Sequence, residues 1–292
     1  MQQHKRRLAP GTRRPRDLIR GRDILVGATN RSSEILLESR ALRRFGKERL
    51  HQPVFERIIR GVATQPWRFT VKLIGIFLSP YVRRVAISLN LLNLPFEEDQ
   101  VFVFGEPDIV RRYNPLVRIP ALVLDDGTNL VESGAILDEI DYMVGPEQRL
   151  TPSDGLPRRR VLQNAAMALG CADKAQWAFY EDRVRPAEKV HTPWIEHNDR
   201  QVLGGFEHLD AAAAKINDGG WIAGTPQISQ ADVTTTAAFT FANLARPHLE
   251  LSRRFPQLAR FVERCEALPA FLKAPLPPTS RLMSVLAQPF VS

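Results

Sequence analysis

The chain has 292 residues, of which 44% are hydrophobic and 25% are charged, so it holds enough apolar material for one large or two ordinary folded domains. Its longest apolar run, around residues 73–78, is far too short to span a bilayer, and its two cysteines exclude a disulfide framework and a four-cysteine zinc site. The formal net charge of +8 makes nucleic acid a candidate partner, which depends on where the basic residues lie.

The basic residues are concentrated at one end of the chain. Residues 1–70 contain 17 Lys and Arg against 6 Asp and Glu, a net charge of +11, whereas the remainder of the chain carries −3. The first 30 residues are rich in Arg and turn formers and contain no aromatic side chain, so they bury too little apolar surface to offset their ordering entropy. Short amphipathic helices fit residues 33–62. We therefore predict that residues 1–70 form a basic, poorly ordered N-terminal extension.

Three interpretations of this extension stay open. A basic arm could contact nucleic acid or an acidic membrane surface. An Arg-rich leader could also be a transit peptide, although six acidic residues and the lack of a clear cleavage signal argue against it. The third interpretation is an appendage without a function of its own, or codons upstream of the true start.

The first folded unit is predicted over residues 71–149 and begins with a strand, a helix and a second strand. An apolar run rich in β-branched residues predicts a buried strand over 71–77. Ser79 is a good helix N-cap and Pro80 a good first helical residue, and apolar residues then recur at helical spacing. A second strand is predicted over 97–103, followed by a short helical or irregular segment.

A hairpin and a helix complete this unit. Apolar segments over 121–124 and 129–131 flank a turn at 125–127, which predicts two antiparallel strands. Glu132 and Ser133 then open a helix with an apolar face. The predicted order is therefore βαβ followed by ββα.

A turn-rich linker leads into a second unit, which we predict to be entirely helical over residues 150–275. Helical patterns run over 158–181 and 193–216, and a last helix is predicted over 255–272. Residues 276–292 then form a C-terminal tail.

A capping box is predicted inside the helical unit at Ser229-Gln230-Ala231-Asp232. The Ser229 hydroxyl can accept from the backbone N–H of Asp232, whose carboxylate can accept from the N–H of Ser229. Ile228 and Val233 flank the box at the positions of a hydrophobic staple. Another helix is therefore expected to begin here.

Three motifs of the first unit resemble those of a known family. They are Ser79-Pro80-Tyr81-Val82-Arg83-Arg84, Asn114-Pro115-Leu116-Val117-Arg118-Ile119-Pro120-Ala121-Leu122 and Glu132-Ser133-Gly134-Ala135-Ile136-Leu137. In this order and at these separations the chain resembles the glutathione S-transferases, and the capping box of the second unit fits the same family. The resemblance covers about residues 71–275. It implies an α+β thioredoxin-like, glutathione-binding domain followed by an all-α domain.

The resemblance implies a serine-type active site at Ser79. Glutathione is a nucleophile as its thiolate, and a thiol with a pKa of about 8.5 is mostly protonated at neutral pH. A hydroxyl hydrogen bond and the positive end of a helix both favour the thiolate, and Ser79 lies at a strand-to-helix junction. A cysteine at this position would indicate mixed-disulfide chemistry, so the serine favours conjugation. The alternative is that Ser79 only caps the helix.

Arg118, Ile119 and Pro120 match the family's central glutathione-binding segment. In the family this proline is cis, and the backbone N–H and C=O of Ile119 would bind the cysteinyl part of glutathione as a short added strand. Arg118 matches a basic position near the glycyl carboxylate, which arginine can bind bidentately. The alternatives are an ordinary trans proline at a strand start and a solvated surface charge.

Glu132 and Ser133 match the residues that meet the γ-glutamyl end of glutathione in the family. Glu132 can pair with the α-amino group, and Ser133 lies at a helix N-terminus, which receives a carboxylate well. Ser133 could also act as the N-cap, and these two roles are compatible.

The electrophile is expected between the two units, against the first long helix of the second. Helical spacing makes Met167, Cys171, Lys174 and Trp177 candidates, although such a stripe could simply be core. Asp173 matches a position that in some family members approaches glutathione across a dimer interface. The sequence contains no P-loop, dinucleotide fingerprint, Gly-x-Ser-x-Gly motif or metal-ligand pattern.

These expectations combine into one functional hypothesis with rivals. The chain is predicted to be a cytoplasmic, homodimeric glutathione transferase that takes glutathione as co-substrate, needs no metal and detoxifies hydrophobic electrophiles. Nucleic acid is a candidate partner only through residues 1–70. A glutathione-dependent isomerase or dehalogenase would use the same thiolate. A non-catalytic protein-interaction module would have lost the glutathione residues, whereas Ser79, Pro120, Glu132 and Ser133 are all retained.

Overall fold

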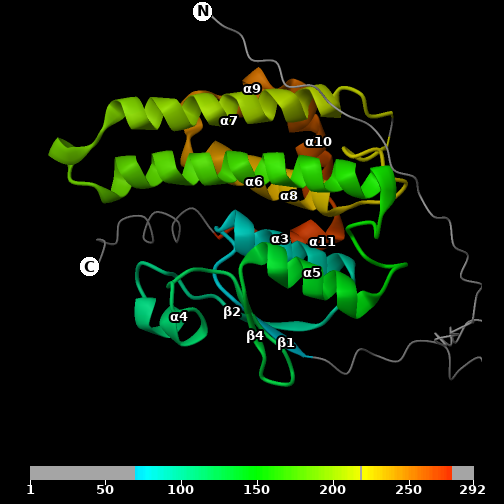
Figure 1. Ribbon diagram of the computed structural model, residues 1–292. Coiled ribbons are helices and arrows are strands. Elements are labelled where there is room, and N and C mark those ends of the chain that lie inside the picture. Colours follow the sequence, from blue (N-terminus) through cyan, green and yellow to red (C-terminus); the bar gives the residue numbers. More distant parts are fainter. Residues whose placement is uncertain (1–69, 218, 278–292) are drawn as a thin grey trace, which may run out of the picture. The chain divides into compact units, whose positions relative to one another are not determined.

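A computed structural model describes residues 70–217 and 219–277, and Figure 1 shows how their helices and strands are arranged. The predictions made for the N-terminal extension and for most of the C-terminal tail lie outside the described residues. Within the described range, a part that contains the sheet precedes a part built from helices.

A small mixed sheet with three helices forms the first part of the described chain. Its elements are β1 (Val71–Ile74), α3 (Pro80–Leu91), β2 (Phe96–Asp99), α4 (Pro107–Tyr113), β3 (Ala121–Val123), β4 (Asn129–Val131) and α5 (Ser133–Val144). The strand order is β2-β1-β3-β4, with β1 parallel to β2 and antiparallel to β3, and β3 and β4 form a hairpin. This is the predicted βαβ and ββα order.

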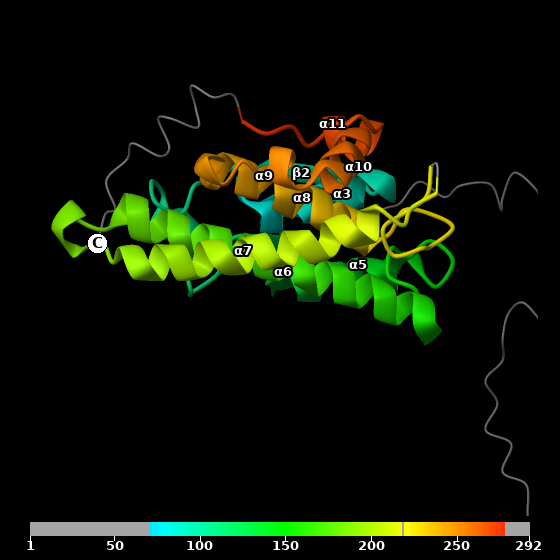
Figure 2. The ribbon, with the colours of Figure 1, turned by 90° about the horizontal axis from the view of Figure 1, so that it is seen from above.

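Helices form the second part. They are α6 (Gly155–Val184), η1 (Ala187–Lys189), α7 (Thr192–Ala213), α8 (Gln230–Ala245), η2 (Pro247–Leu249), α9 (Leu251–Arg254), α10 (Pro256–Glu266) and α11 (Pro269–Leu272). Figures 1 and 2 show α6 and α7 side by side, and α8 packs along α6. The predicted fold class, a sheet-containing α+β domain followed by an all-helical domain, is confirmed. Among the described residues, no helix is long and apolar enough to cross a membrane.

Helix α3 is the element shared by the two parts (Figure 1). It packs against β1 and α5 of the first part and against α8 and α11 of the second. Nine of its twelve residues are buried. Its polar side chains cross between the parts, because Gln230 Nε2 donates to Ser88 Oγ at 2.6 Å and Asn90 Nδ2 donates to the carbonyl of Ala270 at 3.1 Å. The two parts are therefore held together by hydrogen bonds as well as by apolar packing.

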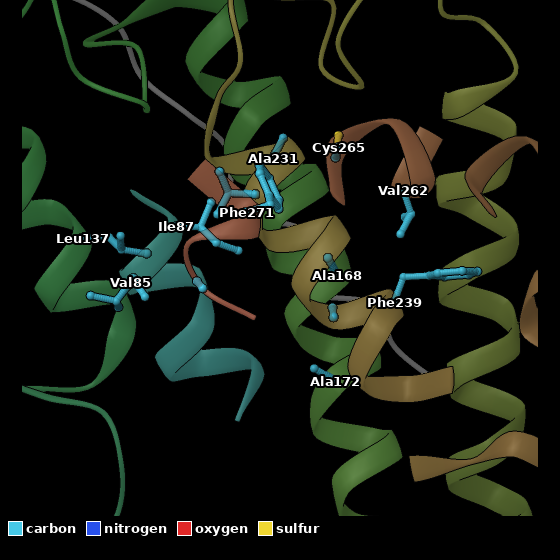
Figure 3. Close-up of a cluster of buried hydrophobic side chains, with 14 of the residues drawn as sticks. Val85, Ile87, Leu137, Ala168, Ala172, Ala231, Phe239, Val262, Cys265 and Phe271 are labelled. Atoms are coloured by element: carbon cyan, nitrogen blue, oxygen red, sulfur yellow. The ribbon is translucent and has the colours of Figure 1, made fainter. Parts of the chain in front are cut away.

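The main hydrophobic core continues through both parts, as Figure 3 shows. Its labelled members come from α3, α5, α6, α8, α10 and α11, and they are Val85, Ile87, Leu137, Ala168, Ala172, Ala231, Phe239, Val262, Cys265 and Phe271. A smaller cluster includes Ile74 of β1 and Val110 of α4. Because successive strand residues point to opposite faces, Ile74 serves this cluster while Leu73 serves the main core.

The predicted capping box is present at the start of α8. The N–H of Ser229 donates to Asp232 Oδ2 at 2.8 Å, and the N–H of Ile222 donates to Asp232 Oδ1, also at 2.8 Å. Burial raises the pKa of the Asp232 carboxyl, and the hydrogen bonds from Ser229 and Ile222 oppose that rise. One buried carboxylate thus starts α8 and also anchors the loop before it.

Several elements end earlier than the sequence pattern predicts: the strand predicted over 71–77 ends at Ile74, and the helix predicted over 193–216 ends at Ala213. The strand predicted over 97–103 ends at Asp99, because its partner β1 ends at the paired residue Ile74. The helix predicted over 255–272 is divided into α10 and α11. Leu268 precedes Pro269, and this position favours an extended backbone, which Leu268 adopts with a ψ of 143°.

The close contact between α6 and α7 depends on Gly205. A Cβ at this position would lie 2.2 Å from Cys171 Sγ, whereas a Cβ on Gly204 would meet nothing within 4 Å. We expect Gly205→Ala to lower the free energy of unfolding by about 1–3 kcal/mol, because the thiol must move within a packed core. Gly204→Ala should be neutral or stabilise the chain by up to about 1 kcal/mol, since alanine favours a helix. Urea denaturation measures both values.

A double variant separates this steric effect from helix propensity. Cys171→Ala removes the sulfur that the new Cβ would meet, so adding Gly205→Ala to it should cost much less than adding Gly205→Ala to the natural chain. Equal stabilities of the Gly204→Ala and Gly205→Ala single variants would contradict the close contact.

Candidate functional site

Ser79 lies where β1 turns into α3. Its N–H donates to the carbonyl of Ile76 at 3.0 Å, and its Oγ accepts from the N–H of Val82 at 3.4 Å as the N-cap of α3. The Ser79 hydroxyl proton is donated to no atom of residues 70–217 or 219–277. The cap uses the oxygen as an acceptor and leaves the proton available, so capping and binding of a thiolate are chemically compatible.

Gly75 lets the end of β1 approach the segment before β3. Its φ of +130° is rarely adopted by other residues, and a Cβ there would lie 2.7 Å from Val82 Cγ2 and 2.9 Å from Ile119 Cβ. Ile119 and Ser79 are thereby brought to the same end of the sheet. A side chain at position 75 would push these two segments apart.

The peptide bond between Ile119 and Pro120 is cis, as the resemblance implies. Within the described residues, the backbone N–H and C=O of Ile119 have no hydrogen-bond partner. The preceding loop is held by the buried side chain of Asn114, whose Nδ2 donates to the carbonyl of Arg118 at 3.0 Å and whose Oδ1 accepts from the N–H of Leu116 at 3.0 Å. The main chain of Ile119 is therefore positioned by its neighbours and free to bind an extended peptide.

Glu132 and Ser133 stand at the start of α5. Glu132, rather than Ser133, is the N-cap: its Oε2 accepts from the N–H of Gly134 at 2.9 Å, and Ser133 is the first helical residue. The Ser133 hydroxyl donates to Glu132 Oε1 at 3.3 Å. Glu132 has a φ of +74°, a conformation that costs a non-glycine residue about 1–3 kcal/mol and that concentrates at functional sites. The exposed carboxylate of Glu132 and the buried hydroxyl of Ser133 therefore both lie at the N-terminus of α5.

Arg118 is exposed and lies near two tyrosines, Tyr81 of α3 and Tyr180 of α6. Burial raises the pKa of both phenols, that of Tyr180 to about 12, and the positive charge of Arg118 opposes the rise in each. Both phenols therefore stay protonated at neutral pH. The exposed cation of Arg118, near Tyr81 and Tyr180, can bind an anion.

The helical side of the site is formed by one face of α6. Tyr81 donates a hydrogen bond to Asp173, and Tyr180 makes edge-to-face contacts with Phe104 at 5.4 Å and with Trp177 at 6.4 Å between ring centroids. Asp173, Trp177 and Tyr180 follow one another at the i, i+4, i+7 spacing of a single helix face. Asp173 binds Tyr81 of its own chain, and its approach to glutathione across a dimer interface stays a prediction.

Met167 and Cys171 do not line this face, which corrects the prediction made for them. Cys171 Sγ is directed at the carbonyl of Val202 of α7 at 3.8 Å, and both sulfurs lie next to Gly205. A step of two residues along a helix turns the side chain by about 200°, so Cys171 and Asp173 point in nearly opposite directions. The exposed Trp177 is the predicted residue that does contact Tyr180.

Sequence reasoning missed Phe104 and Tyr180 as members of the site. Phe104 belongs to the loop between β2 and α4 and carried no motif, whereas Tyr180 could have been found by its helical spacing from Asp173. Among residues 70–217 and 219–277, no cluster of three or more histidine, cysteine or acidic side chains could hold a metal ion. What these residues can offer is hydroxyl, main-chain, cationic and aromatic contacts.

Comparisons of sequence identify relatives over most of the described chain. Residues 73–147 match a family model described as the N-terminal domain of glutathione S-transferase. A zeta-class glutathione S-transferase of Euphorbia esula is 30% identical over 222 residues, which cover 72% of this chain and 92% of that protein. A maleylacetoacetate isomerase of Pseudomonas aeruginosa is 29% identical over 227 residues, which cover 70% of this chain and 95% of that protein.

Comparison of structures gives a similar relative. A glutathione S-transferase of Methylobacillus flagellatus, solved with glutathione bound, superposes with a TM-score of 0.65 at 27% identity. The match covers 71% of this chain and 100% of that one. The matched share of the chain is close to the share that residues 70–217 and 219–277 make up.

The two cysteines should be unreactive in the folded chain. Both are buried, and burial raises the pKa of each thiol to about 12, so both remain protonated well above neutral pH. We expect Ellman's reagent at pH 8 to label neither Cys171 nor Cys265 until denaturant unfolds the chain, when both react. Rapid labelling of the folded chain would show that a chain thiol can compete with a bound substrate thiol.

Proposed function

Because the chain belongs to the glutathione S-transferase family, we propose that it binds glutathione and uses its thiolate to attack a hydrophobic electrophile. The observation that carries this proposal is the position of the Ser79 hydroxyl. A hydroxyl whose proton is uncommitted stands at the N-terminus of α3, where a thiolate sulfur can accept its hydrogen bond. A hydrogen bond to a charged group contributes about 1.5–3 kcal/mol, or roughly one to two units of thiol pKa. That shift populates the nucleophilic form at neutral pH.

The rest of the glutathione molecule matches the polarity of the neighbouring residues. Ile119 offers its main chain to the cysteinyl part, and Arg118 offers a cation to the glycyl carboxylate. Glu132 offers a carboxylate to the γ-glutamyl ammonium group, and Ser133 offers the start of α5 to the carboxylate beside it. Each charged group of glutathione therefore meets a group of suitable charge or dipole.

A second candidate activity is glutathione-dependent isomerisation. It is favoured by the similarity to a maleylacetoacetate isomerase and to a zeta-class transferase. The thiolate would add to a double bond, allow rotation about the resulting single bond and then leave, so glutathione is regenerated. Dehalogenation would begin with the same thiolate attack and release halide. Conjugation, isomerisation and dehalogenation would all require Ser79 to stabilise the thiolate.

Several properties of the proposed enzyme follow from the family and from general chemistry. We place it in the cytoplasm, because its two cysteines are both free. We propose a homodimer that detoxifies apolar electrophiles without a resident metal. Sedimentation of the purified chain would test the dimer, and a monomer at micromolar concentration would contradict it.

Removing the Ser79 hydroxyl should raise the pKa of bound glutathione. We expect Ser79→Ala to shift the thiol pKa upward by about one to two units, so that the ultraviolet absorbance of the bound thiolate disappears at pH 7 and transferase activity falls at least tenfold. The lost cap should cost only about 1 kcal/mol of stability, so the fold should persist. A pH titration of thiolate absorbance measures the shift.

Ser79→Thr is the matched control, because it keeps a hydroxyl and should keep most of the thiolate signal. An unchanged thiol pKa in Ser79→Ala would remove the catalytic role from Ser79. Failure of the natural chain to bind glutathione in calorimetry would contradict the proposed function as a whole.

Measuring glutathione itself should separate conjugation from isomerisation. With chlorodinitrobenzene, conjugation consumes one thiol for each product formed. With maleylacetoacetate, isomerisation changes the substrate absorbance while the thiol concentration stays constant. We expect Ser79→Ala to slow whichever reaction occurs, because both require the thiolate. Loss of activity toward one substrate only would show that the two reactions use different groups.

A further inference from the structure

Two neighbouring arginines of α3 are both buried, and they differ in how they are bonded. Arg83 is fully paired: its Nη1 and Nη2 donate to the two carboxylate oxygens of Glu266 at 2.6 and 2.5 Å, and its Nε donates to the carbonyl of Ala274 at 2.9 Å. This bidentate ion pair ties α3 to α10 and to the chain after α11. The burial of Arg83 therefore has a structural explanation.

Arg84 has no such explanation. Its exposed fraction is 5%, and its Nε and Nη1 have no hydrogen-bond partner among the described residues. Burial lowers the pKa of its guanidinium to about 10, so Arg84 is still a cation at neutral pH. Among the described ionisable groups, Glu132 and Tyr81 lie close enough to act on Arg84 electrostatically, and both oppose that fall. The Tyr81 phenol itself is protonated and therefore uncharged at neutral pH. No carboxylate in the described chain forms an ion pair with it.

These two neighbours place the Arg84 charge within the candidate site. Tyr81 belongs to the first turn of α3, beside Ser79, and Glu132 is the N-cap of α5, beside Ser133. The buried charge is therefore close enough to act on Glu132 at the start of α5 and on Tyr81 in the first turn of α3. It adds to the positive ends of two helices, each of twelve residues.

A buried and unpaired guanidinium costs stability, because the charge has lost its hydration and gained no partner. Replacing such a charge with an apolar side chain of similar size is often neutral or stabilising. This loss of stability is offset when a bound substrate supplies the missing anionic partner. Glutathione is such a partner, because it carries two carboxylates against one ammonium group and becomes more negative when its thiol ionises.

We propose that Arg84 is a positioning residue whose buried positive charge is neutralised by the anionic groups of bound glutathione. It acts through the electric field at Glu132, Ser133 and Ser79 and need not touch the substrate. This inference rests on the proposed function, and it adds a residue outside the segments that would contact glutathione directly.

The test compares Arg84→Met, Arg84→Lys and Arg83→Met in the full chain. Two probes are used: S-methylglutathione, which has no free thiol and reports binding of the charged backbone, and glutathione, whose thiolate absorbance is titrated against pH. We expect Arg84→Met to weaken S-methylglutathione binding by about tenfold and to raise the pKa of the bound thiol by about one unit. Arg84→Lys keeps the charge and should recover most of both losses.

The melting temperatures of the variants distinguish a positioning role of Arg84 from a structural one. Arg84→Met should keep or raise the melting temperature, because it removes an unpaired buried charge. Arg83→Met should lower the melting temperature, because it leaves Glu266 without its partner, and it should leave the thiol pKa unchanged. A structural role for Arg84 predicts the opposite for Arg84→Met, namely a lower melting temperature or failure to fold.

The outcomes distinguish this inference from the proposed function. If the natural chain binds glutathione while Arg84→Met changes either the affinity for S-methylglutathione by less than about twofold or the thiol pKa by less than about 0.3 unit, the inference is wrong and the proposed function stands. Failure of Arg84→Met to fold also overturns it. If the natural chain binds no glutathione, the proposed function fails first.

Discussion

The burial of α3 on nearly every side is the constraint on which both the core and the candidate site depend. A helix between a sheet and a set of helices has little water to satisfy its polar side chains, so each needs a partner from another element. Arg83 has Glu266, Ser88 has Gln230, and Asn90 has the carbonyl of Ala270. Because the loss of any of these partners leaves a buried polar group unpaired, the contacts make the relation between the two parts specific.

The first turn of α3 differs from the rest of the helix, because its polar groups face the site. Ser79 caps the helix with its oxygen and keeps its proton, and Tyr81 is bound by Asp173 of α6. The cysteines lie elsewhere in the core, and burial keeps their thiols protonated. A fold that keeps its own thiols buried and protonated, and that places a hydroxyl at a helix N-terminus, is suited to activating the thiol of a substrate. The chemistry proposed here follows from that division.

Much of the fold could be predicted because the signals are local. The Ser79-Pro80 start of α3, the hairpin and the Ser229 capping box each depend on residues within one turn or loop. The cis bond before Pro120 came from family resemblance rather than from local physics. The predictions were wrong where the end of an element or the direction of a side chain depends on a neighbouring element. The end of β2 depends on the length of β1, and the direction of Cys171 depends on how α6 is rotated against α7.

Arg83 and Arg84 show most clearly what cannot be predicted from the sequence alone. They are adjacent, identical and buried, so neither composition nor periodicity distinguishes them. One step along the helix turns the side chain by about 100°, which directs one guanidinium to Glu266 of the helical part and the other toward Glu132 and Tyr81. The first is explained by the protein alone. The second has a buried Nε and Nη1 without a hydrogen-bond partner among the described residues, and the proposed binding of glutathione would supply the negative charge that offsets its desolvation.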